Sequence, residues 1–237
     1  MKRLIVAVVT MAGVTLLSAS SRPIPPDTRS FLFGSGKDTG RETFTRTATS
    51  LSGDMMFSNL RMHYEAKLAP DGTIPRLDVR TTTSGAKAQA PRVASVIVGR
   101  DSTDVTEQQA GKTESVRLAT QPGLLPMINL SIGLTELVVA RARLQKTASA
   151  MVPVFIAADI DSLSHAPLRS RAATGPIVVT FLRGDTVMIG RSTPTYEKDK
   201  VRLILDADGR IRSVMSGADA KDHFSAHLTA TPRSPQR

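Results

Sequence analysis

The sequence predicts an α+β fold that is predominantly antiparallel β, with a curved sheet or half-barrel and one long amphipathic helix. Three observations favour it: roughly ten strand-like segments follow one another closely, short Gly-containing turns join many of them, and a single stretch has a helical period. Parallel strands would need a long crossover between each pair, so connections of this length indicate antiparallel pairing.

The first 20 residues have the pattern of a secretory signal peptide. Lys2 and Arg3 precede an apolar run over residues 4–17, and the small residues Ser18 and Ser20 follow it. The run is too short to span a bilayer comfortably. We therefore expect cleavage after Ser20, export to the periplasm or the extracellular medium, and no transmembrane anchor after cleavage.

Residues 21–30 are rich in proline and predict an extended leader, after which residues 31–217 are expected to form a single β-rich domain. Turn chemistry predicts two hairpins, around Pro70-Asp71-Gly72 and around residues 206–209, because Gly supplies a positive φ. Pro75 cannot donate a ladder hydrogen bond, so its strand is expected at a sheet edge or a bulge.

The helical stretch is predicted over residues 126–144. Pro126 would occupy its first turn, and Glu136 lies off the apolar stripe. The stripe that would pack on the sheet consists of Met127, Leu130, Leu134, Leu137 and Leu144. Apolar content falls after residue 217, and residues 218–237 are expected to be a partly disordered tail.

Composition excludes several classes of function. The chain has no Cys, which excludes disulfides, thiolate catalysis and cysteine-ligated metals. It has no Trp and only 2 Tyr, so the stacking platforms of single-stranded nucleic-acid binders are missing and no nucleic-acid partner is expected. Removing Lys2 and Arg3 lowers the net charge from +10 to +8, which still favours anionic partners such as lipid phosphates or acidic glycans.

No catalytic, cofactor or metal site is predicted, because each partial motif lacks a required element. Ser131 resembles the serine of a nucleophile elbow, but Asn129 replaces the first glycine and the serine falls in the predicted helix. His223 and His227 are spaced for one helix face but lack an evident third ligand. Asp159 and Asp161 are interpreted as turn residues at a strand end.

The strand-rich pattern with its one helix resembles the exported half-barrel proteins of the bacterial envelope, namely the lipoprotein-carrier family and related uncharacterised periplasmic domains. The resemblance implies a strongly curved sheet that holds a helix or an acyl chain in its concave face. It covers the pattern of elements alone, and the aromatic lining of the carriers is sparse in this chain.

The leading hypothesis is a non-catalytic exported protein that binds an apolar or anionic envelope component, such as a lipid. Met62 and Met127 are the predicted apolar lining, because thioether side chains adapt to varied apolar ligands. Two alternatives stay open: a structural or assembly protein that acts through the edge strand marked by Pro75, and a hydrolase. The sequence does not indicate an oligomeric state.

Overall fold

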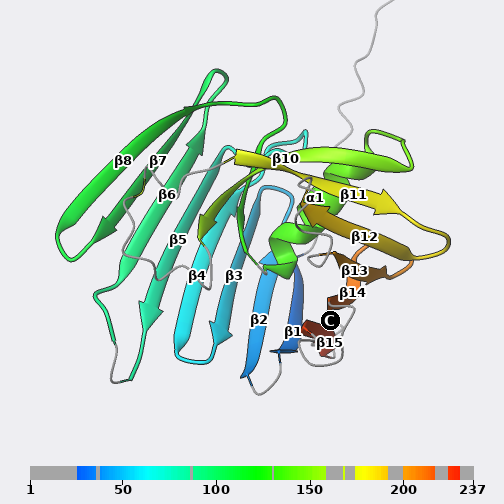
Figure 1. The fold of residues 1–237 in the computed structure, drawn as a ribbon, viewed down its shortest axis with the longest axis horizontal. Coiled ribbons are helices and arrows are strands. Elements are labelled where there is room, and N and C mark those ends of the chain that lie inside the picture. Colours follow the sequence, from blue (N-terminus) through cyan, green and yellow to red (C-terminus); the bar gives the residue numbers. More distant parts are fainter. Residues whose placement is uncertain are drawn as a thin grey trace, which may run out of the picture.

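The computed structural model describes residues 26–35, 38–85, 88–129, 131–158, 168, 174–191, 200–216 and 224–229. Within these residues the chain forms 15 strands and one α-helix, and all the strands belong to one sheet (Figure 1). The sequence prediction of a mostly antiparallel, curved sheet with one helix is confirmed at this level.

The first half of the sheet is a meander in which each strand pairs antiparallel with the next. Its strands are β1 (Asp27–Ser35), β2 (Asp38–Arg46), β3 (Ser50–Phe57), β4 (Leu60–Lys67), β5 (Arg76–Thr83), β6 (Arg92–Val98), β7 (Ser102–Gln109) and β8 (Lys112–Ala119).

The second half begins with a parallel crossover, in which the helix connects two strands that pair parallel, β9 and β10. Its elements are β9 (Leu125–Ile128), α1 (Ile132–Arg143), β10 (Ser149–Ala158), β11 (Thr174–Phe181), β12 (Thr186–Arg191), β13 (Val201–Leu205), β14 (Ile211–Ser216) and β15 (Phe224–Thr229). Strand β15 pairs with both β14 and β1 and so joins the two halves, which leaves β8 and β9 as the two ends of the sheet.

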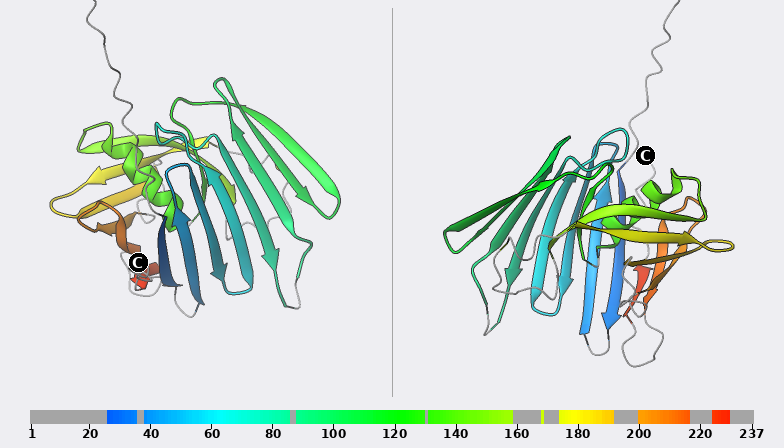
Figure 2. Two further views of the ribbon diagram at one scale, coloured as in Figure 1. Left: turned by 180° about the vertical axis from the view of Figure 1, so that it is seen from behind. Right: turned by 45° about the horizontal axis from the view of Figure 1, so that its top comes forward.

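The sheet curves until its second half faces part of its first half. Strand β9 contacts β5, and β10 contacts both β6 and the helix. Figures 1 and 2 show α1 lying inside this curve. The helix therefore fills part of the concave face, as the half-barrel prediction allowed.

Side chains alternate between a buried inner face and an exposed outer face along most strands of the first half. In β4, Leu60, Met62, Tyr64 and Ala66 are buried, while the residues between them are exposed. The Phe31 and Phe44 rings stack at a centroid distance of 6.0 Å on the inner face. The polar side chains that alternate with the buried ones therefore lie on the outer face, and the core lies between the sheet and α1.

Both predicted Asp-Gly hairpins are confirmed. Gly72 has a φ of +78° and Gly209 a φ of +77°. Each glycine amide donates to the carbonyl oxygen of the residue three positions earlier, at 2.9 Å. These turns set the register of β4 with β5 and of β13 with β14.

The predicted helix of residues 126–144 is shorter, and it does not present one apolar stripe. Pro126 and Met127 belong to strand β9, and α1 has 12 residues. Leu134 and Leu137 are buried as predicted, but Leu144 is 66% exposed and Glu136 is buried; Leu130 lies outside the described residues. Buried residues occur all around the helix, as is typical of a helix enclosed by the core.

One further prediction, the position of Pro75, is wrong. Pro75 lies just before β5, whose strand runs between β4 and β6 in the interior of the sheet, so it marks no edge. The predicted tail contains β15, because residues 224–229 fill the position between β1 and β14. At the other end, β1 already begins at Asp27, inside the predicted leader.

Candidate functional site

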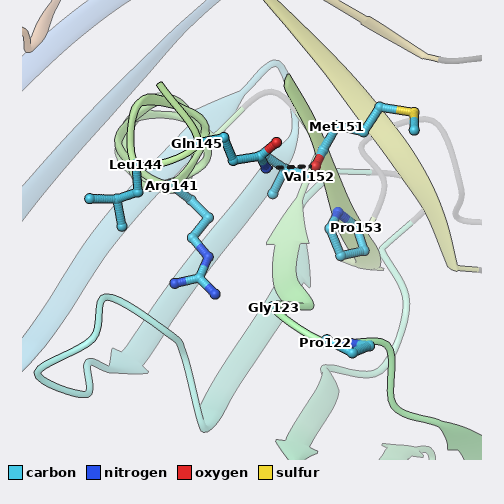
Figure 3. A pocket seen from close by; sticks show the side chains of 8 residues that line it. All are labelled: Pro122, Gly123, Arg141, Leu144, Gln145, Met151, Val152 and Pro153. Carbon is cyan, nitrogen blue, oxygen red and sulfur yellow. Dashed lines mark hydrogen bonds between the residues drawn. The ribbon is translucent and has the colours of Figure 1, made fainter. Parts of the chain in front are cut away.

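A half-open pocket of about 320 Å³ lies beside the C-terminal end of α1 (Figure 3). Three segments form it: the turn before β9, the last turn of the helix with the residues just after it, and the first half of β10. Its lining residues are Pro122, Gly123, Arg141, Leu144, Gln145, Met151, Val152 and Pro153. The pocket is at the lower end of the size range of ligand sites, roughly 300 to 1,000 Å³.

The charged group of this pocket is Arg141, whose side chain extends from the helix toward Gly123 (Figure 3). One of its guanidinium nitrogens donates to the carbonyl oxygen of Asp71 at 3.3 Å, which positions the side chain against the β4–β5 turn. A Cβ atom on Gly123 would lie 3.0 Å from the other terminal nitrogen, and Gly123 has a φ of +76°. Glycine at this position therefore allows the guanidinium to lie close to the backbone.

The other walls combine apolar side chains with polar groups. Leu144 is 66% exposed and Met151 is 61% exposed, while Val152 is buried and Pro153 lies across the space from Arg141. The Gln145 amide donates to the Met151 carbonyl oxygen at 2.9 Å and ties the end of the helix to β10. A cation beside exposed apolar groups is suited to hold an anionic amphiphile without forming a covalent bond.

A separate polar cluster lies at the other end of the helix, around Glu42 on β2. Its carboxylate is fully buried and accepts hydrogen bonds from the Tyr64 hydroxyl at 2.7 Å and the Ser131 hydroxyl at 2.7 Å. The backbone amides of Ile132 and Gly133 donate to it at 2.6 and 3.4 Å. Glu42 thus satisfies the first amides of α1 with a residue from a different element.

Burial raises the pKa of Glu42, and its hydrogen bonds oppose that shift. Burial also raises the pKa of the Tyr64 hydroxyl well above its usual value, and the nearby Glu42 adds to this rise. Ser131 is the N-cap of α1, and its oxygen accepts from the Leu134 amide at 3.3 Å. Perturbed pKa values often mark active sites, but these groups are enclosed by the core and bonded to one another, which indicates a structural role.

A buried ion network follows one turn along the helix. Glu136 is 4% exposed, and its carboxylate accepts from Arg210 and from the Ile211 amide, the latter at 3.0 Å. Arg210 also pairs with Asp27, and Arg29 lies 3.6 Å from Glu136 and 2.7 Å from Asp206. Burial raises the pKa of Glu136, while Arg210 opposes the rise. The network connects β1, α1 and the β13–β14 turn.

No group of three or more His, Asp or Glu side chains suited to a metal occurs among the residues that the structure describes. His227 is exposed on β15, whereas His223, Asp159 and Asp161 lie outside the described residues.

The predicted lining residues are buried elsewhere. Met62 is 3% exposed and Met127 is 5% exposed, and both belong to the core rather than to the pocket. Their contact with a ligand stays a prediction. The pocket could not be predicted from the sequence, because its residues come from three segments that are separated along the chain.

Neither a protein-family model nor a curated protein matches this chain. Solved structures with a similar fold include a β-barrel-like protein of the domain of unknown function DUF1849 from Brucella abortus. It is 9% identical, has a TM-score of 0.54, and the match covers 86% of this chain and 94% of that chain.

A DUF1089 family protein from Pseudomonas aeruginosa is 12% identical, with a TM-score of 0.49 and a match over 73% of this chain and 86% of that one. Neither structure is described as a lipoprotein carrier. The likeness to the Brucella protein, together with the single curved sheet, supports a β-barrel-like fold for this chain.

Proposed function

We propose that this protein is an exported, non-catalytic binding protein that holds an apolar or anionic envelope component, and that the pocket beside α1 is its binding site. The observation that carries the proposal is that Arg141 lines one pocket together with Leu144 and Met151, two apolar residues that are exposed to solvent. A surface that combines a guanidinium with two large exposed apolar groups matches a ligand with an anionic head and an apolar tail.

The size of the pocket limits what it holds. A volume of about 320 Å³ is enough for a short apolar segment with its head group, and a longer chain would continue over the exposed side of Met151. The fork of an arginine binds carboxylate or phosphate through two parallel hydrogen bonds. We therefore propose fatty acids or phospholipids as the ligand class.

A binding titration tests this proposal with a fluorescent fatty acid as the probe. Wild-type protein is expected to give a saturable signal, and Arg141→Gln is expected to weaken the affinity about tenfold or more, because a hydrogen bond to a charged group contributes about 1.5 to 3 kcal/mol.

Arg143→Gln is the matched control. Arg143 lies on the same helix, is exposed, and does not line the pocket. Equal weakening by both variants would mean that net charge drives the signal. A wild-type protein without saturable binding would overturn the proposal. Charged substitutions at Met62 or Met127 are poor tests, because both residues are buried in the core.

Export is part of the same proposal and is supported by the charged, apolar and small-residue pattern of residues 1–20. No helix in the described parts of the chain combines the length and the apolar character needed to cross a bilayer. When the full-length chain is expressed in a bacterial host, the protein recovered from the periplasm or medium is expected to begin at Ser21. An intact mass that still includes Met1 would contradict this expectation.

The two alternatives have little to favour them. Assembly through an edge strand depended on Pro75, and β5 is an interior strand. Of the two edge strands, β8 carries Lys112, Glu114 and Arg117, charges that discourage pairing between sheets, and the residues of β9 are buried. No observation among the described residues favours a hydrolase.

A further inference from the structure

The outer face of the sheet carries a strip of alternating apolar and cationic side chains at one level of four neighbouring strands. Leu32 on β1 is opposite Arg41 on β2, Arg41 is opposite Met56 on β3, and Met56 is opposite Arg61 on β4. We call these four residues the outer strip. Figures 1 and 2 show β1 to β4 lying side by side in every view.

All four side chains of the outer strip reach solvent. Leu32 is 53% exposed and Met56 is 41% exposed, and both arginines are exposed. Directly opposite residues in a sheet have Cβ atoms about 4.5 to 5.5 Å apart, so the four groups form one continuous surface. Removal of the exposed Leu32 and Met56 side chains from water is energetically favourable.

The charge of the outer strip is not neutralised within the described part of the chain. No carboxylate there pairs with Arg41 or Arg61, and the neighbouring acids Asp54 and Glu65 instead face His63, at 2.9 and 3.4 Å. Two other arginines of the same face are paired, since Arg76 lies 2.7 Å from Asp78 and Arg117 lies 2.6 Å from Asp104. The outer strip is therefore an unpaired cationic surface with apolar groups between the charges.

We propose that the outer strip docks the protein on the surface of a bilayer that contains anionic lipids. Each guanidinium would bind lipid phosphates through its fork, while Leu32 and Met56 enter the boundary between head groups and acyl chains. A surface on which charged and apolar side chains alternate fits this boundary, because charged head groups and acyl chains meet there. A nucleic acid would need cations with stacking aromatics instead, and the outer strip has none. The site is separate from the pocket, so each proposal can fail without the other.

Vesicle co-sedimentation tests the docking surface. The chain should start at Ser21, because the apolar run of residues 4–17 would itself enter a bilayer, and this chain retains every residue that the structure describes. Wild-type protein is expected to bind vesicles of phosphatidylcholine with phosphatidylglycerol and not vesicles of phosphatidylcholine alone. The double variant Arg41→Gln/Arg61→Gln is expected to bind about 25-fold more weakly, since a basic residue near an anionic surface contributes roughly fivefold.

The matched control is Arg76→Gln/Arg117→Gln, which removes the same charge from paired positions on the same face. It is expected to keep most of the binding.

A second variant, Leu32→Ser/Met56→Ser, keeps the charge and removes the apolar groups. Its remaining binding to vesicles is expected to disappear at high salt, because screening weakens electrostatic attraction alone. Three results would overturn the proposal. They are a wild-type protein that does not bind anionic vesicles, an equal loss of vesicle binding in the two arginine variants, and preferential binding of the wild-type protein to single-stranded DNA. Circular dichroism checks that each variant is folded.

Discussion

Replacing Glu136 by alanine is expected to lower the free energy of unfolding by about 3 to 5 kcal/mol, the usual cost of removing one partner of a buried ion pair. The carboxylate is 4% exposed and lies between Arg210 and Arg29, whose side chains are largely buried. Without it, two guanidinium groups keep their desolvation cost and lose the more buried of the two carboxylates that they share, the other being Asp27. The amide of Ile211 also loses its acceptor.

Urea denaturation followed by circular dichroism measures the effect. The control is Asp104→Ala, which breaks the pair with Arg117 on the outer face, where both side chains are well exposed. Exposed pairs contribute about 0 to 1 kcal/mol, so this variant should unfold close to wild type. If the two variants have similar stabilities, the Glu136 network does not join the two halves of the sheet in the way inferred here.

Much of the sheet could be predicted from the sequence because strand and turn signals are local. The period of two and the Asp-Gly turns place β4 and β5 correctly, and a turn of this kind specifies its own register. The position of Pro75 shows the limit of such reasoning. A proline cannot donate a ladder hydrogen bond, but the ladder of β5 simply begins at the next residue, so the strand can lie inside the sheet.

The helix boundary could not be predicted because a short apolar strand and an enclosed helix have the same composition. Residues 125–128 are all buried and continue into a helix that is buried on nearly every side. Periodicity does not separate the two cases. The burial of Glu136 depends on Arg29 and Arg210, which lie far from it in the sequence, and the place of β15 depends on a gap between β1 and β14 that exists only in the folded sheet.

The candidate site was the least predictable part. Met62 and Met127 were predicted to line the site because their thioether side chains adapt to varied apolar surfaces. In the structure both side chains pack in the hydrophobic core. Arg141 lies in the basic last turn of α1, where cations offset unpaired carbonyls. Arg141 and Met151 line one pocket because β10 returns beside the helix, and this return is a consequence of the parallel pairing of β10 with β9.

Replacing Glu42 by glutamine is expected to lower the free energy of unfolding by about 2 to 4 kcal/mol, although the two side chains have almost the same shape. All four partners of the carboxylate are donors, and three of them point at one of its oxygens. An amide has one oxygen. If that oxygen serves Tyr64 and Ser131, the amide nitrogen faces the Ile132 N–H, and the helix loses both an acceptor and a negative charge at its N-terminus.

A double-mutant cycle with Tyr64→Phe separates this effect from a general loss of packing. Tyr64→Phe removes one donor and leaves the carboxylate in place to accept from α1, so its cost should be smaller, on the order of 1.5 to 3 kcal/mol for a hydrogen bond to a charged group. Because the two residues share a hydrogen bond of 2.7 Å, the double variant should lose less stability than the two single losses added together. Strict additivity would mean that the Tyr64–Glu42 bond does not contribute to the stability of the helix start. The inference that β2 caps the helix through a buried carboxylate would then rest on the Ser131 hydroxyl and the Ile132 and Gly133 amides.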